Sequence, residues 1–177
     1  MCNFASQFLA IYSVKIKEVL DALEQFAPLP LQEGFDNAGL QVGLTEAEVS
    51  GALLCLDVTE TIIDEAIALG CNVIVSHHPL IFHKLSQICG ADFVQRIVIK
   101  AIEHKIAIIS MHTNIDNVRG GVNFKIAEKI GLTNVQFLGE RKTVQVVLDN
   151  GEKMVSEGAS GVIGYFSQSM PAQQFVS

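Results

Sequence analysis

Three histidines and one aspartate stand directly after predicted β-strands, where the chemistry of many α/β proteins takes place. His77 and His78 follow one short apolar run, and His112 and Asp116 follow the next. Because neighbouring strands lie about 4.8 Å apart, side chains from two adjacent strand ends can meet at one ion. Imidazole nitrogens together with a carboxylate suit Zn²⁺, Mn²⁺ or Fe²⁺. The spacing therefore predicts a divalent-metal site at this edge of the sheet.

The adjacent pair His77 and His78 favours two ions over one. Successive side chains diverge along an extended backbone, so neighbouring histidines cannot easily share an ion. Pro79 has a fixed φ angle and biases His78 toward an extended shape, which holds the pair rigid. We therefore expect two divalent metal ions, one taken by each histidine.

The other histidines have weaker claims to a metal. His112 is either a ligand or a residue that orients Asp116, transfers a proton or hydrogen-bonds a substrate, and the second interpretation is favoured. His104 falls in the last turn of a predicted helix, where a cation suits the helix dipole. His83 lies in a loop beyond the two adjacent histidines. We expect neither His83 nor His104 to coordinate a metal.

The segments that position these residues alternate between strand and helix patterns. Short apolar runs predict strands, and apolar residues at helical spacing predict helices. The expected strands are 51–58, 71–76, 106–111 and 143–148, and the expected helices are 14–27, 60–69, 92–105 and 122–130. Thr59 is placed to cap the helix at 60–69 and Gly70 to end it. Alternation of this kind is typical of βαβ units, so the fold class is α/β with a mostly parallel sheet and flanking helices.

Three segments carry more specific expectations. The almost wholly apolar run 51–58 resembles a strand buried on both faces. The segment 31–43 is rich in turn residues, and its Asp36-Asn37-Ala38-Gly39 portion is expected to be a solvated turn. Gly120-Gly121 precedes the helix at 122–130 and is more typical of a turn and helix entry than of a phosphate-binding loop.

The composition of the 177 residues excludes several classes of protein. A hydrophobic content of 49% with only 18% charged residues argues against disorder and provides for one core. Because 19 acidic residues outnumber 12 lysines and arginines, nucleic acid is not an expected partner. No apolar run is long enough to predict a membrane span. The four cysteines form no CxxC pair and are expected to be reduced in a cytoplasmic protein.

Four separated motifs occur in a specific order: DNAGLQVG (36–43), SHHPLIF (76–82), HTNIDN (112–117) and GGVNFKIAEKIGL (120–132). Together they resemble the Nif-three-like family, whose bacterial members are commonly labelled type 2 GTP cyclohydrolase 1 homologues. The resemblance runs from about Val14 to Gln136. It implies a pair of divalent metals, with His77 and His78 each contacting one ion and Asp116 sharing the ion of His78. It also implies a toroidal homohexamer with the metal sites facing an internal cavity.

The chain departs from the family pattern at both ends. Family members continue into a second α/β half, which returns a histidine and a glutamate to the metal site, whereas no histidine follows His112 here. We expect an N-terminal extension (1–13), an α/β metal-binding domain (14–136), and a fourth strand with a stub of a truncated second half (137–177). Translation from Val14 is an alternative to translation from Met1. Either one weakly held ion or ligands from another chain would suit the shortened site.

The leading functional interpretation is a metal-dependent hydrolase that acts on a small, nucleotide-like molecule through metal-activated water. The resemblance implies GTP cyclohydrolase activity in particular. The alternative from another class is a non-catalytic metal-binding or interaction module that forms a toroidal oligomer. A third interpretation is a truncated relic that folds poorly because one edge of its apolar sheet is uncovered.

Overall fold

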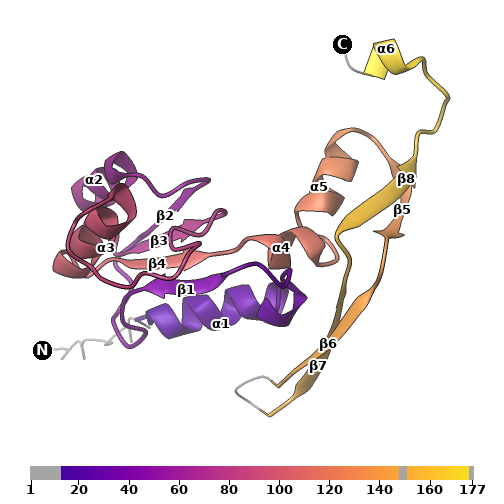
Figure 1. Cartoon of the computed structure of the whole chain (residues 1–177). Helices are drawn as coiled ribbons and strands as arrows, with labels where there is room; N and C mark the ends of the chain where they lie inside the picture. The colour runs from indigo at the N-terminus through magenta and orange to yellow at the C-terminus, as the bar shows by residue number, and fades with distance from the viewer. Residues whose placement is uncertain (1–12, 148–150, 176–177) are drawn as a thin grey trace, which may run out of the picture.

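The structure is a computed structural model that describes residues 13–147 and 151–175, so all but the last residue of the expected N-terminal extension lies outside the described residues (Figure 1). Its elements follow one another along the chain as helices and strands of modest length. They are α1 (Ile16–Phe26), the short 3₁₀ helix η1 (Leu29–Leu31), β1 (Gly39–Val42), β2 (Ala52–Cys55), α2 (Glu60–Leu69), β3 (Val73–Ser76), α3 (Phe93–Glu103), β4 (Ala107–Ser110), α4 (Thr113–Asn117), α5 (Val122–Lys129), β5 (Thr133–Leu138), β6 (Lys142–Val147), β7 (Lys153–Gly158), β8 (Gly161–Tyr165) and α6 (Ala172–Phe175).

A four-stranded sheet organises the N-terminal part of the chain. Its strand order is β1-β4-β3-β2, with β2, β3 and β4 parallel and β1 antiparallel to β4. Helices α2 and α3 lie on one face and α1 lies on the other (Figure 1). The prediction of an α/β fold with a mostly parallel sheet is confirmed. Strands β3 and β4 run in register with Ser76 opposite Ser110, so the residues that follow them emerge side by side.

The sheet separates two apolar clusters. Ile74 and Ile108 belong to the cluster beneath α2 and α3, whereas Val73 and Ile109 belong to the cluster beneath α1. All four side chains are fully buried. This division follows from the alternation of side chains along a strand, which sends successive residues to opposite faces. The two clusters fix the inner strands β3 and β4, and therefore fix the ends from which the histidines emerge.

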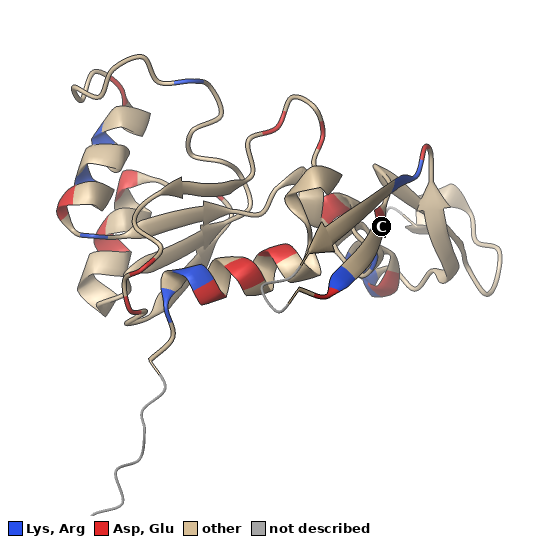
Figure 2. Ribbon diagram, turned by 90° about the horizontal axis from the view of Figure 1, so that it is seen from below, with Lys and Arg blue, Asp and Glu red and all other residues tan. Residues whose placement is uncertain are grey.

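The helices follow their local sequence signals closely. The predicted helix at 60–69 has the bounds of α2, the Thr59 side chain accepts a hydrogen bond from the Ile62 N–H, and Gly70 adopts a left-handed conformation at φ 69°. On α1 the exposed side carries charges of both signs, including the pair Lys17 and Asp21 at 2.7 Å (Figure 2). Among the described residues, no helix is both long and apolar enough to cross a bilayer.

Two expectations about the sheet are wrong. The run 51–58 is expected to be buried on both faces, but β2 is an edge strand and Leu54 is 77% exposed, because the cluster beneath α1 includes residues of β1, β4 and β3 but none of β2. The turn-rich segment 31–43 contains the strand β1, which pairs with β4. Gly39 is the first residue of this strand and Gly43 follows its last, and both have positive φ angles.

The C-terminal strands form two small sheets outside the main one. The strand predicted at 143–148 exists as β6, although Leu148 lies outside the described residues, and it pairs with β7 in an antiparallel hairpin. Strand β5 pairs with β8 in a second antiparallel pair. The sequence did not predict β5, β7 or β8, because each has only five or six residues and gives a weak local signal. The division of the chain near residue 136, which falls within β5, stays a prediction.

Candidate metal centre

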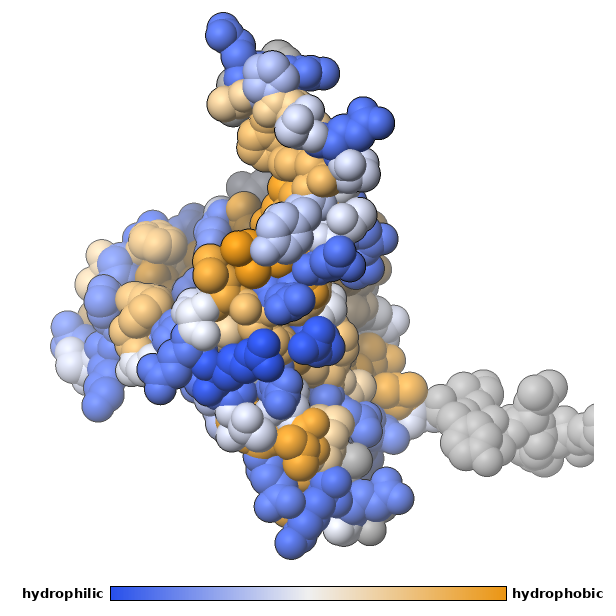
Figure 3. Space-filling view, turned by 90° about the vertical axis from the view of Figure 1, so that its right-hand side faces the viewer, coloured by the Kyte–Doolittle hydropathy of each residue, from blue (hydrophilic) through white to orange (hydrophobic). Residues whose placement is uncertain are grey.

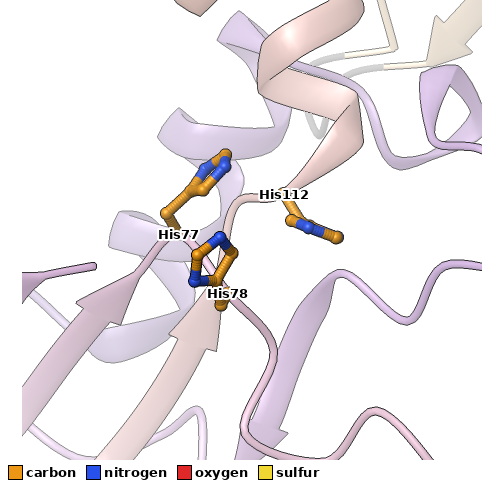
Figure 4. Close-up of side chains that lie close together, drawn as sticks. All are labelled: His77, His78 and His112. Atoms are coloured by element: carbon orange, nitrogen blue, oxygen red, sulfur yellow. The ribbon is translucent and has the colours of Figure 1, made fainter. Parts of the chain in front are cut away.

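Three histidine rings meet just beyond the ends of β3 and β4 (Figure 4). The ring centroids are 4.9 Å apart for His77 and His78, 5.2 Å for His77 and His112, and 5.6 Å for His78 and His112. One possible ligand atom from each residue lies within 4.8 Å of the other two. His77 and His78 follow β3, and His112 stands at the start of α4, so the in-register strand ends bring the three together.

The adjacent histidines do not diverge as an extended backbone would require. The chain bends at His77 and His78. The backbone N–H groups of both residues donate to the segment that contains β2, at the carbonyls of Cys55 and Leu56. The bend places both rings on the same side of the sheet edge. The expectation of two ions depended on divergent side chains, which the structure does not have. The number of ions therefore stays a prediction.

Each histidine has its Nδ1 atom held by the protein, which leaves Nε2 without a hydrogen-bond partner among the described residues. The Nδ1 contacts are His77 with the Met111 carbonyl at 2.9 Å, His78 with Asp57 Oδ1 at 2.7 Å, and His112 with Asp36 Oδ1 at 2.8 Å. An acceptor at Nδ1 favours the tautomer with its proton there, and the lone pair of Nε2 is then available. Metal-binding histidines in proteins commonly have this arrangement.

Asp36 is a buried carboxylate, and the expectation that it lies in a solvated turn is wrong. Its side chain is 0% exposed and accepts hydrogen bonds from His112, from the Thr113 N–H at 3.0 Å, from the Thr113 hydroxyl and from the Asn37 N–H at 2.6 Å. Burial alone would raise the pKa of Asp36, but the hydrogen bonds from Thr113 and His112 outweigh it and lower the pKa. The carboxylate therefore stays charged and fixes the ring of His112.

Asp116 lies at the margin of the cluster. Its Oδ1 is 3.8 Å from Nε2 of His77, which is too long for a hydrogen bond. Burial raises the pKa of Asp116, and the nearby imidazoles of His77 and His112 oppose this only in part. A positive ion beside the carboxylate would reverse the effect of burial. The structure thus groups His112 with His77 and His78, while the expected ligand Asp116 lies close to one of them.

The remaining histidines lie apart from this cluster. His83 packs its ring against Phe82 at 5.3 Å, and His104 caps the C-terminus of α3, at the opposite end of β4. In the described ranges, His77, His78 and His112 are the one group of three or more potential ligands found close together.

Sequence reasoning missed the two carboxylates that orient histidines. Asp57 follows β2 at the same sheet edge, so the rule that pointed to the other strand ends could have found it. Asp36 precedes β1, and because β1 is antiparallel to β4, with Gly39 opposite Ser110, the start of β1 lies at this edge. Only the recognition of β1 as an antiparallel strand could have located Asp36 there.

Comparisons with known proteins agree with the fold and with the sequence motifs. A family model described as Duf34/NIF3 (NGG1p interacting factor 3) matches residues 14–177. A protein of Clostridium acetobutylicum named GTP cyclohydrolase 1 type 2 homolog is 35% identical over 162 residues, which are 92% of this chain and 57% of that protein. A protein of the same name from Clostridium perfringens is 42% identical over 118 residues, 67% of this chain and 45% of that protein.

Solved structures of related proteins superpose on much of this chain. The Staphylococcus aureus protein SA1388 has a TM-score of 0.77 and 29% identity, covering 92% of this chain and 62% of that one. Reduced HcgD from Methanocaldococcus jannaschii has a TM-score of 0.67 and 29% identity, covering 75% of this chain and 54% of that one. This chain spans about half the length of the curated relatives that it matches. The resemblance noted in four motifs is confirmed, and the chain belongs to the Duf34/NIF3 family.

Proposed function

We propose that this chain carries the metal site of a metal-dependent hydrolase that acts on a small, nucleotide-like molecule. The observation that carries the proposal is the convergence of three imidazoles whose Nδ1 atoms are all held by acceptors. A relative named GTP cyclohydrolase 1 type 2 homolog supports a nucleotide-like substrate. Because the chain spans 57% of that relative, activity of the whole protein is part of the proposal.

The proposed ligands are His77, His78 and Asp116, holding two divalent ions. Imidazole nitrogen and carboxylate oxygen form a donor set that suits Zn²⁺, Mn²⁺ or Fe²⁺. The fit is supported by the available Nε2 atom of each histidine and by the carboxylate of Asp116, 3.8 Å from Nε2 of His77. Divalent ions in such a site polarise the group under attack and lower the pKa of water.

The residues of this chain position the ligands and provide a route for a proton. The Met111 carbonyl, Asp57 and Asp36 each hold one ring in a fixed tautomer. His112 donates its Nδ1 proton to the buried Asp36, so its Nε2 can accept a proton from water or from the substrate. Direct coordination by His112 is the alternative role.

We further propose a cytoplasmic homo-oligomer, with a hexamer as the specific expectation. The exposed apolar side chains of Leu54 and Leu56 on the uncovered sheet edge support an association through apolar surface.

The test is a count of metal ions per chain by elemental analysis, after purification without chelator. We expect about two equivalents for the wild type, a large loss for His78→Ala, and no change for the matched control His104→Ala, which alters a histidine outside the cluster. Absence of metal from the wild type would overturn the proposal. Incubation of the metal-loaded chain with GTP then tests the reaction, and full metal content without ring opening would favour the non-catalytic metal-binding module.

A further inference from the structure

Two of the three arginines in the chain pack on one aromatic ring. The guanidinium carbon of Arg119 lies 4.6 Å from the ring centroid of Phe137 and 5.5 Å from that of Phe124. The guanidinium carbon of Arg141 lies 5.9 Å from the centroid of Phe137. The two rings meet edge to face at 5.2 Å, and Phe137 is buried. Both positive charges are thus gathered around one small patch, which we call the Phe137 patch (Arg119, Phe124, Phe137 and Arg141).

Neither guanidinium of the Phe137 patch has an acidic partner in the part of the chain that the structure describes. Within residues 13–147 and 151–175, no carboxylate lies within ion-pair distance of Arg119 or Arg141, although acidic residues outnumber basic ones in the sequence. The third arginine, Arg96, pairs with Glu60 at 2.7 Å. Lys142, the neighbour of Arg141, pairs with Glu33 at 3.0 Å. The two stacked arginines are therefore the ones left to bind an anion from outside the chain.

Stacking prepares both arginines for such an anion. A guanidinium that rests on an aromatic ring keeps its N–H edge free, and its planar fork matches the oxygens of phosphate or carboxylate. Because the ring already restrains the side chain, less conformational entropy is lost on binding. Arg119 comes from the turn between α4 and α5, and Arg141 comes from the turn between β5 and β6, so tertiary structure brings them together.

The start of α5 adds to the positive character of this region. Gly121 is the N-cap of the eight-residue helix, and no side chain caps the first N–H groups there. The N-terminus of a helix carries partial positive charge. Arg119 is two residues before Gly121 and three residues after Asp116, the expected metal ligand. The Asn123 side chain of α5 donates to the Asp116 carbonyl at 3.0 Å, which ties the start of this helix to the segment of the expected ligand.

We propose that Arg119 and Arg141 bind the phosphate groups of a small phosphorylated molecule. This assigns a substrate class to the histidine cluster, whose expected ligand Asp116 lies three residues before Arg119 in the sequence, and in that role it rests on the proposed function. A nucleic acid does not suit the patch, because two unpaired guanidinium groups supply few phosphate contacts and the chain carries a net charge of −7.

The test measures the binding of inorganic pyrophosphate to the full chain by calorimetry, at low salt and with EDTA present. We expect the wild type to bind, and we expect Arg119→Gln and Arg141→Gln each to weaken binding roughly tenfold or more, because each removes a charge-assisted hydrogen-bonding group. The double variant should lose binding altogether. Arg96→Gln is the matched control and should leave binding unchanged, since Arg96 is already paired.

Thermal unfolding without ligand separates binding from stability. Arg119→Gln removes the closer contact with Phe137, at 4.6 Å, so it should lower the midpoint more than Arg141→Gln, whose guanidinium carbon lies 5.9 Å from the same ring. No binding by the wild type, equal binding by the double variant, or tighter binding of a short single-stranded RNA than of pyrophosphate would overturn the anion site. His78→Ala should retain pyrophosphate binding while losing metal, so a failure of the metal proposal and a failure of the anion site give different results.

Discussion

Apolar side chains are buried to different extents in two parts of the chain. The first part is built on the four-stranded sheet, and the second comprises β5 to β8. In the first part, Ile108 and Ile109 on the inner strand β4 are fully buried, one in each apolar cluster. In the second, apolar side chains stay exposed on the surface (Figure 3). Val147 of β6, for example, is 63% exposed. A two-stranded sheet has too little surface to bury both of its faces.

This difference in burial determines how firmly each part can fix functional side chains. The histidines follow strands that are packed on both faces, and a backbone carbonyl and two carboxylates, one of them buried, fix their rings. The arginines of the Phe137 patch stand where the two parts meet, and a single buried ring restrains them. Packed strands therefore support a site that needs fixed ligand atoms, whereas the junction supports contacts that tolerate adjustment.

The largest expected effect comes from a substitution in the apolar core of the first part. Ile108→Ala should lower the free energy of unfolding by about 2–5 kcal/mol, because it leaves a cavity in a fully buried cluster. Val147→Ala, at an exposed position of β6, should change it by less than about 0.5 kcal/mol. Urea unfolding followed by circular dichroism measures both. Equal losses would show that the two parts are packed alike.

A second substitution tests the junction between the two parts. Gly158 of β7 bridges Val118, and a Cβ atom there would lie 2.8 Å from the Asn117 carbonyl oxygen. Gly158→Ala should therefore lower the free energy of unfolding by about 1–3 kcal/mol. Gly161→Ala is the matched control, because its nearest neighbours are 3.9 Å away. Hydrogen exchange at the Ala159 amide, which donates to Asn117, would report local separation, and unchanged exchange in Gly158→Ala would contradict the close contact.

A third prediction compares the two carboxylates that hold histidines. In the alternative role, in which His112 coordinates the metal directly, Asp36→Asn should weaken metal binding about 10–100-fold, because it removes a buried charge that orients His112. Asp57→Asn should have a smaller effect, since the Asp57 side chain is 61% exposed and water can replace it. Competition titration with Zn²⁺ measures both affinities. A larger loss of Zn²⁺ affinity in Asp57→Asn than in Asp36→Asn would show that burial of a carboxylate does not decide how strongly it affects metal binding.

The smallest expected effect is a pH dependence at the junction. The hydrogen bond from Lys142 lowers the pKa of Glu33, and the Asn117 side chain adds to this shift. Because the folded pKa lies below the unfolded value, the contact stabilises the fold above the unfolded pKa of about 4.5 and is lost as the pH falls through the folded pKa.

Solvent screening limits the contribution of Glu33 to about 1 kcal/mol or less. Urea midpoints between pH 6 and pH 3 should therefore converge for the wild type and Glu33→Gln as the pH falls. A constant difference in urea midpoint between the wild type and Glu33→Gln across this range would show that protonation of Glu33 does not cause the pH dependence.

The elements with strong local signals could be predicted from the sequence. The bounds of α2 follow from Thr59, Gly70 and helical periodicity, all within one stretch of chain. The strand β1 could not be predicted, because its pairing with β4 joins residues about 70 positions apart. The edge position of β2 depends likewise on which strands lie beside it, and no local pattern records that.

The sequence by itself determined the α/β fold class, the family and the strand ends at which His77, His78, His112 and Asp116 stand. Hydrophobic periodicity, caps and ordered motifs suffice for this, because they act over short distances along the chain. Only the tertiary structure decided that His112 joins the other two histidines, that Asp36 is a buried partner, and that two arginines share one ring. Those arrangements depend on contacts between distant segments, whose energies arise from burial and hydrogen bonding in the folded chain.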